Sequence, residues 1–252
     1  MQTFTKLLIA ASSAMLLSTG AQAVGVVIDD FNDTQTIIKD TSSDDSGQWS
    51  QVAGGMLGGF RDIFVTKLAD SQNDTDGLGT SIGVVNPGVL SFSNDDFQSG
   101  VGIVRWDGAT AGSGTDLASA IGSINATGLG GVNLDASGIG FEIEVVSADL
   151  DFNFQLYAYT NAGQFSIIQL TSTGAGTYFI PFAAFAGGFT VGGGVDFSNV
   201  GALQAVINYP DSVANVDLRI DIVQSVPEPA SLALAGLALV AAGVARRRQQ
   251  KA

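Results

Sequence analysis

The stretch Phe141–Leu170, "FEIEVVSADLDFNFQLYAYTNAGQFSIIQL", decides the fold class. Three apolar residues alternate with two glutamates in Phe141–Val145, and a similar alternation runs through Leu150–Tyr157. A period of two residues places alternate side chains on opposite faces of a β-strand. Thr160–Gly163 ("TNAG") then predicts a turn into a further strand. The stretch therefore predicts consecutive antiparallel strands with one buried face.

The same pattern of short strands and turns extends through most of the chain. Gly, Asn and Asp separate the apolar runs, and helical periodicity is limited to Asp116–Ile121 within the long, Gly-rich loop 109–131. We therefore predict an all-β fold, an antiparallel β-sandwich of the jelly-roll kind, in residues 24–226. The other clear strand predictions are Val24–Phe31, Gly58–Leu68, Gly176–Phe182, Val200–Asn208 and Val216–Ile222.

The N-terminus predicts export. One basic residue precedes the mostly apolar run Leu7–Leu17, and Ala21-Gln22-Ala23 forms an A-x-A cleavage site. This order is typical of a secretory signal peptide. We expect residues 1–23 to be a cleaved signal helix, with Ala21 and Ala23 at the cleavage site and a mature chain that begins near Val24.

The C-terminus carries a second targeting pattern. The run Ser231–Ala245 contains 15 residues without charge, whereas a membrane-spanning helix needs about 20. Pro227 and Pro229 prevent its extension towards the body, and the arginines that follow favour the cytoplasmic side. Two interpretations stay open, a short tail anchor that is kept and a temporary stop-transfer signal that is removed.

The order of these parts resembles the PEP-CTERM sorting signal. The triplet Pro227-Glu228-Pro229 comes first, followed by the short apolar helix and then by Arg246, Arg247 and Arg248. The resemblance implies that residues 227–252 are recognised by an exosortase, a membrane-embedded processing enzyme, after transient anchoring in the membrane. It also implies export through the inner membrane of a Gram-negative bacterium that makes exopolysaccharide. The destination would be the cell envelope, the cell surface or the extracellular matrix.

Composition excludes several function classes. Residues 24–226 contain 5 basic and 23 acidic residues, a net charge of −18, which argues against binding nucleic acid. Such a body is compatible with divalent cations and neutral glycans. The chain has neither cysteine nor histidine. Disulfides, histidine-based triads and histidine-ligated zinc are therefore excluded.

The body also resembles a galactose-binding-like jelly roll of the carbohydrate-binding-module type. The resemblance rests on Asp29-Asp30-Phe31, on "YFIPFAAF" (Tyr178–Phe185), on "VDFSNV" (Val195–Val200) and on "VDLRIDIV" (Val216–Val223). It implies a structural Ca²⁺ shared by an acid near the first strand and one on the last, here Asp30 and Asp221. Separately, Gln72–Gly77 ("QNDTDG") resembles half of a calcium-binding loop.

Five residues are candidates for glycan binding. Asn153, Gln155, Tyr157 and Tyr159 share one strand face, opposite the buried residues, and Trp106 is a second aromatic candidate. Aromatic rings stack on sugar rings, and amides hydrogen-bond to hydroxyls. The alternative is that these tyrosines are ordinary strand formers, or that another segment covers their face.

Catalysis is the weaker interpretation. Glu142 and Glu144 point to one face, and "FEIEVVS" resembles the E-x-D-x-x-E strand of some jelly-roll glucanases. Glu144 stands in place of the aspartate, however, and Ser147 replaces the last acid. We expect a non-catalytic matrix or envelope protein associated with exopolysaccharide, which binds glycan or serves a structural role. The alternatives are a glycan hydrolase that uses Glu142 and Glu144 and a matrix protein that self-assembles through its strand edges.

Overall fold

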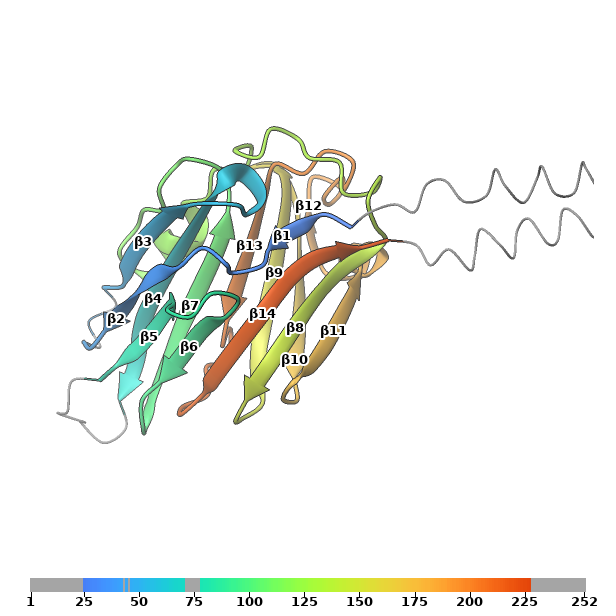
Figure 1. Ribbon diagram of the computed structural model, residues 1–252. Coiled ribbons are helices and arrows are strands. Elements are labelled where there is room, and N and C mark those ends of the chain that lie inside the picture. Colours follow the sequence, from blue (N-terminus) through green and yellow to red (C-terminus); the bar gives the residue numbers. More distant parts are fainter. Residues whose placement is uncertain (1–24, 43, 45, 71–77, 228–252) are drawn as a thin grey trace, which may run out of the picture. The chain divides into compact units, whose positions relative to one another are not determined.

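The computed structural model describes residues 25–42, 44, 46–70 and 78–227. Gly25–Val226 forms one compact unit of two antiparallel sheets packed against each other (Figure 1). The prediction of an all-β, two-sheet antiparallel sandwich is therefore confirmed. The predicted signal helix, the loop Gln72–Gly77 and the tail beyond Pro227 lie outside the described residues.

The two sheets each contain seven strands. In sheet A the order is β11-β8-β14-β6-β5-β2, with β1 paired to β14, and in sheet B it is β12-β10-β9-β13-β7-β4-β3. The strands of sheet A are β1 (Val27–Asp29), β2 (Gln35–Asp40), β5 (Thr80–Val84), β6 (Leu90–Asn94), β8 (Gly140–Ala148), β11 (Gly176–Pro181) and β14 (Asp217–Val226). The strands of sheet B are β3 (Gln48–Ala53), β4 (Phe60–Asp70), β7 (Gln98–Trp106), β9 (Phe152–Asn161), β10 (Gln164–Ser172), β12 (Phe189–Val191) and β13 (Ala202–Ile207).

Helical structure is confined to short segments of the described chain. The helix α2 (Leu117–Gly122) coincides with the predicted one, and the Asp116 carboxylate caps it by accepting a 2.9 Å hydrogen bond from the Ser119 N–H. Two 3₁₀ turns, η2 (Leu57–Gly59) and η3 (Phe182–Gly187), connect strands. Across the described residues, no helix has the length and hydropathy of a membrane span.

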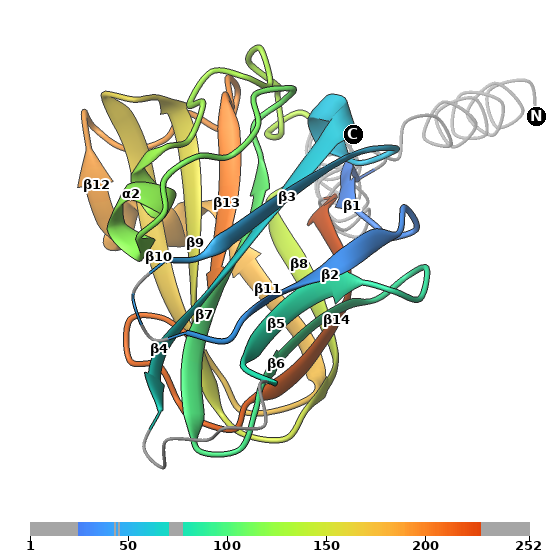
Figure 2. The same ribbon diagram turned by 90° about the vertical axis from the view of Figure 1, so that its left-hand side faces the viewer.

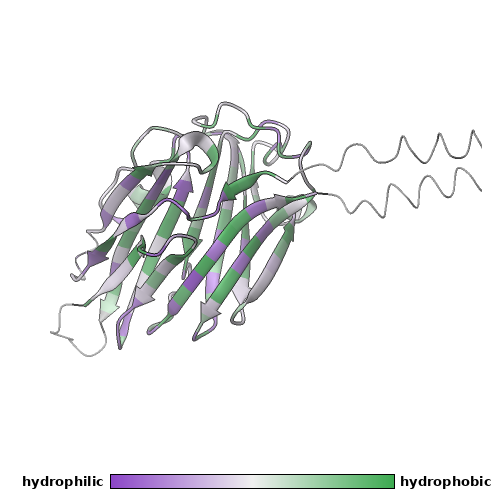
Figure 3. Cartoon of the chain, in the orientation of Figure 1, coloured by the Kyte–Doolittle hydropathy of each residue, from purple (hydrophilic) through white to green (hydrophobic). Residues whose placement is uncertain are grey.

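Apolar side chains from both sheets fill the space between them. Colouring by hydropathy shows the alternation along the strands (Figure 3). At the β8 end, the Phe141 ring meets the rings of Phe182, Phe185 and Phe197 at centroid distances of 5.1, 5.8 and 5.9 Å. Such ring contacts add to the free energy of burial. The 3₁₀ turn η3 is thereby held against sheet A.

A buried ion pair joins the two sheets. Asp29 of β1 and Arg61 of β4 lie on opposite sheets, and the Arg61 Nη1 atom donates to both Asp29 oxygens at 2.9 and 3.0 Å. Trp106 Nε1 donates to Asp29 Oδ2 at 2.9 Å, and Arg61 Nε donates to Gln35 Oε1 at 2.9 Å. The Arg61 guanidinium also lies 5.3 Å from the Phe31 ring centroid. Burial raises the pKa of Asp29, and Arg61 opposes that effect. The pair therefore depends on complete hydrogen bonding within the core.

We expect Asp29→Ala to lower the free energy of unfolding by about 3–5 kcal/mol, because it leaves the Arg61 charge buried without its carboxylate. The exposed Asp151→Ala is the matched control and should change stability by less than about 0.5 kcal/mol. Urea unfolding followed by circular dichroism measures both. Equal stability of the two variants would show that the buried pair does not hold the sheets together.

Candidate functional site

The four glycan-binding candidates on β9 lie on the outer face of sheet B, but their exposure differs. Asn153 and Gln155 are partly exposed, whereas Tyr157 and Tyr159 are each only 6% exposed. The prediction that both tyrosines form an open platform is therefore wrong. Burial raises the pKa of Tyr159 to about 12 and also raises that of Tyr157, so both phenols stay neutral at physiological pH.

The tyrosines are buried because α2 and its flanking loop lie over this part of sheet B (Figure 2). Side chains of the sheet hold that segment through its backbone carbonyls. Trp49 Nε1 donates to the Gly114 carbonyl at 2.8 Å, and Arg105 Nη2 donates to the Ala120 carbonyl. The sequence predicts a long loop at residues 109–131. The helical periodicity of Asp116–Ile121 is the one feature of that loop that indicates a segment able to pack over the sheet.

Trp106, predicted as an aromatic candidate for glycan binding, is not at the surface. It lies in the core between the sheets, 1% exposed, with its indole N–H bonded to Asp29. A ring in that position cannot stack on a sugar. Its sequence context, at the end of a mostly apolar strand, fits a core residue as well as a surface one.

An open groove remains on sheet B, beside the covered tyrosines. It has a volume of about 500 Å³ and runs along β10 towards η3 and β12. Its lining residues are Gln155, Ile167, Ile168, Gln169, Ala184, Gly187, Gly188 and Phe189, none of which is charged. Gln155 is the one residue of the groove that the sequence predicted.

The register of the strands explains why these side chains meet. Ile167 of β10 pairs with Phe189 of β12 on one side and with Tyr157 of β9 on the other, and Gln169 pairs with Gln155. Paired residues of neighbouring antiparallel strands share a face of the sheet. Gly188 permits the approach of η3, since a Cβ there would lie 2.2 Å from the Ile167 carbonyl oxygen.

A row of aromatic rings leads from the covered face into the groove. Centroid distances are 6.3 Å from Tyr157 to Tyr159, 4.9 Å from Tyr159 to Phe165 and 6.3 Å from Phe165 to Phe189. Phe189 ends the row and is 62% exposed. The Tyr157 hydroxyl donates to Gln155 Oε1 at 2.8 Å, which leaves the amide N–H groups of Gln155 for a ligand. The groove thus combines an exposed aromatic ring with two neutral amides.

Sequence reasoning missed Phe189. It sits on a three-residue strand between glycines at 187–188 and 192–194. A large aromatic residue isolated among glycines is the signal that could have identified it, since nothing next to it along the chain can bury the ring.

Of the two predicted calcium ligands, Asp221 lies at the turn before β6, on the same side as Asn32. Oδ1 of Asn32 and Oδ1 of Asp221 would each lie 3.9 Å from a Cβ added to Gly88. The other predicted ligand, Asp30, is held next to Asn32, since its carboxylate accepts hydrogen bonds from the Asn32 backbone and side chain at 3.1 and 2.7 Å. Within the described residues, no three Asp, Glu, His or Cys side chains gather as a metal cluster. A cation here would therefore need amide, carbonyl or water oxygens as well.

Glu142 and Glu144 lie on the outer face of sheet A, away from the groove. They pair across the strands with Phe179 and Thr177 of β11, and Glu142 accepts a 2.9 Å hydrogen bond from Gln224. Neither glutamate lines the groove on sheet B.

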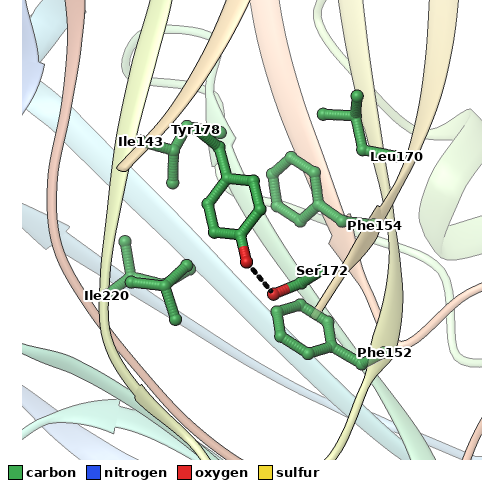
Figure 4. Close-up of a pocket in the computed structure, with 8 residues that line it drawn as sticks. Ile143, Phe152, Phe154, Leu170, Ser172, Tyr178 and Ile220 are labelled. Atoms are coloured by element: carbon green, nitrogen blue, oxygen red, sulfur yellow. Dashed lines mark hydrogen bonds between the residues drawn. The ribbon is translucent and has the colours of Figure 1, made fainter. Parts of the chain in front are cut away.

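A small cavity lies between the sheets. Its volume is about 20 Å³, and its walls are mostly apolar side chains such as Phe152, Phe154 and Ile220. The Tyr178 hydroxyl bonds to Ser172 Oγ there at 2.9 Å (Figure 4). That volume is close to the room that one water molecule requires. The cavity is a packing defect of the core and is too small for a sugar.

We expect Tyr159→Ala to lower the free energy of unfolding by about 3–5 kcal/mol, as for other buried aromatic residues. Phe189→Ala should lower it by less than about 1 kcal/mol, because most of its ring is already in water. Urea unfolding of the two variants provides the comparison. A stable Tyr159→Ala protein would mean that the face under α2 is open in solution.

Comparison with known proteins adds two findings. None of the curated proteins compared with the chain matches it in sequence. The body resembles the family 11 carbohydrate-binding module from Clostridium thermocellum in complex with a β-1,3-1,4-mixed-linked tetrasaccharide, with 12% identity, a TM-score of 0.36 and coverage of 81% of this chain and 98% of that one. It is also similar to an agarase, with 9% identity, a TM-score of 0.35 and coverage of 66% of this chain and 25% of the agarase. These values are too low to transfer a ligand or an activity.

The second finding concerns the C-terminus. Residues 225–249 match the PEP-CTERM protein-sorting motif, which confirms the resemblance seen in the proline triplet, the apolar run and the arginines. The chain therefore carries the PEP-CTERM sorting signal and is an exported protein sorted to the cell surface.

Proposed function

We propose that the body binds a neutral glycan of the extracellular matrix in the groove on sheet B, without catalysis. The observation that carries the proposal is the exposed Phe189 ring with Gln155 and Gln169 in one uncharged groove. An aromatic face stacks on the C–H groups of a sugar ring, while amides exchange hydrogen bonds with its hydroxyls. The sorting signal supports this role, because it brings the protein to the cell surface.

The acidic body favours a neutral ligand over an anionic one. The predicted mature chain carries a net charge of −18, and the groove offers no cationic side chain to offset it. An anionic polysaccharide would meet repulsion unless cations screened it. Exopolysaccharide of the producing cell is the natural source of such a glycan.

A structural Ca²⁺ at Asp30 and Asp221 fits the same proposal. Asn32 Oδ1 is available beside Asp221 at the Gly88 turn, and oxygen ligands of this kind suit Ca²⁺. The ion would connect the segment that follows β1 with strand β14, at a distance from the groove.

Binding can be measured by affinity electrophoresis of the purified chain in gels that contain host exopolysaccharide, mixed-linkage β-glucan, agarose or alginate. We expect retardation by at least one neutral polysaccharide and none by alginate. Phe189→Ala and Gln169→Ala should each weaken binding by about tenfold, equivalent to ~1.4 kcal/mol. The matched control is Phe179→Ala, which removes an exposed phenylalanine from sheet A and should leave binding unchanged.

Two other results would redirect the proposal. Loss of binding in Phe179→Ala but not in Phe189→Ala would move the site to sheet A, next to Glu142 and Glu144, and revive the hydrolase interpretation. Absence of binding to every polysaccharide, together with concentration-dependent assembly in sedimentation velocity, would favour the self-assembling matrix protein.

The sorting signal yields a separate prediction. Deletion of residues 227–252 should move the protein from the cell-surface fraction to the medium, because an exosortase then has no signal to recognise. Fractionation and immunoblotting of the producing cells measure this change. Unchanged surface retention would mean that the body, for instance through glycan binding, is sufficient to hold the protein at the cell.

A further inference from the structure

A pair of buried aspartates lies under the segment that covers sheet B. Asp62 of β4 and Asp107, just after β7, are each 1% exposed. Neither oxygen of Asp62 accepts a well-formed hydrogen bond, and the same is true of Asp107 Oδ1. Asp107 Oδ2 is satisfied, since it accepts from the Asn125 N–H at 2.7 Å. The donors nearest to Asp62 are the Gly112 N–H and the Gln51 amide, and Asp62 also lies within reach of Asp107. Three carboxylate oxygens are thus removed from water with only poorly aligned hydrogen bonds, which costs free energy unless a ligand binds them.

The nearest arginine does not fill this role. Arg105 stands opposite Asp62 in the strand register, yet no ion pair joins it to either aspartate in the described part of the chain. Its Nε atom donates to Gln204 Oε1 at 2.9 Å, its Nη2 atom donates to the Ala120 carbonyl, and its guanidinium lies 4.8 Å from the Trp49 ring centroid. Arg105 reduces the local negative charge but forms no ion pair with any of the three oxygens.

The remaining groups around Asp62 are neutral. They are the Gln51 side chain and the backbone N–H of Gly112. The Gln51 Nε2 atom is buried and has no well-formed hydrogen bond either. Rotation of this amide by half a turn would present Oε1 in its place. The buried pair would then offer oxygen atoms from three side chains.

We propose that Asp62 and Asp107 bind one divalent cation, Ca²⁺ in preference to softer metals, with Gln51 as a third ligand. Carboxylate and amide oxygens are the donors that Ca²⁺ takes, and neither histidine nor thiolate is present to favour zinc. Water and backbone carbonyls of the covering segment complete the coordination. The cation neutralises the carboxylates and fastens the segment that carries α2 to sheet B.

This site is separate from the predicted calcium pair at Asp30 and Asp221. Those residues belong to the chain after β1 and to β14, both on the sheet A side, whereas Asp62 and Asp107 belong to the outer face of sheet B. The two positions can therefore be tested independently. Trp49 offers a local probe of the new site, because a Cβ on Gly112 would contact its ring at 2.3 Å.

The experiment titrates the purified full chain with Ca²⁺ after removal of metals by chelator. The melting temperature should rise by roughly 5–10 °C at a hundredfold excess of Ca²⁺ over Kd. The exposed Asp151→Asn should keep the full rise. Asp221→Asn removes the other proposed calcium site, and the rise that remains in it should be lost when Asp62→Asn or Asp107→Asn is added. Circular dichroism in chelator confirms that each variant is folded.

Terbium luminescence reports on binding at the Asp62–Asp107 site itself, because Trp49 lies beside it. Tb³⁺ bound at the new site should emit on excitation of Trp49, and the emission should fall at least fivefold in Asp62→Asn and in Trp49→Phe. Chelator should also increase quenching of Trp49 by acrylamide, because the covering segment loosens.

Two outcomes would overturn the proposal. One is a calcium-induced rise of the same size in Asp62→Asn as in the unmodified chain. The other is no effect of Ca²⁺, with an unfolding free energy that decreases as pH rises from about 4 to 7. That second pattern is expected if Asp62 and Asp107 share a proton in place of a cation. Burial and the Asp107 charge raise the pKa of Asp62 to about 7. A raised pKa stabilises the folded state only while the carboxyl group stays protonated, so stability falls as the pH rises towards that pKa.

Discussion

The contact on which the rest of the body depends is the buried pair of Asp29 and Arg61. It connects β1, which belongs to sheet A, to β4 in sheet B, and it draws Trp106 and Gln35 into one hydrogen-bonded group. A charge in the core is tolerable only when its partner is held in place. The strands around this pair can therefore adopt one alignment, and that alignment determines which side chains reach the outer face of sheet B.

The outer face of sheet B is divided into two parts with different roles. Under α2, Arg105 and Tyr159 are buried, and Arg105 holds the covering segment through a hydrogen bond to the Ala120 carbonyl. Beside it, the groove leaves Phe189 open to solvent. The aromatic row between them gives the exposed ring a rigid support, which lowers the entropy lost when a ligand stacks on it. In this view the covered part stabilises the part that we propose to bind glycan.

Several features followed from local pattern alone. Alternation in Phe141–Leu170 identified the β8, β9 and β10 strands, and the isolated helical window near Asp116 identified α2. The site was harder to predict. Gln155 was found because polar residues on a strand face are visible in sequence, whereas the exposure of Tyr157 was misjudged. The alternation along a strand predicts which face of the sheet a residue occupies. It does not predict whether a segment distant in sequence covers that face.

The sequence by itself determined the class of fold, the acidic character of the body and the sorting signal, because each depends on residues that are neighbours along the chain. Only the tertiary structure decided which aromatic rings meet water. Trp106 lies inside, where its N–H binds Asp29, and Phe189 is 62% exposed on β12, a short strand at the edge of sheet B. Both outcomes depend on residues far apart in sequence. Long-range packing decides exposure, and exposure decides where a ligand can bind.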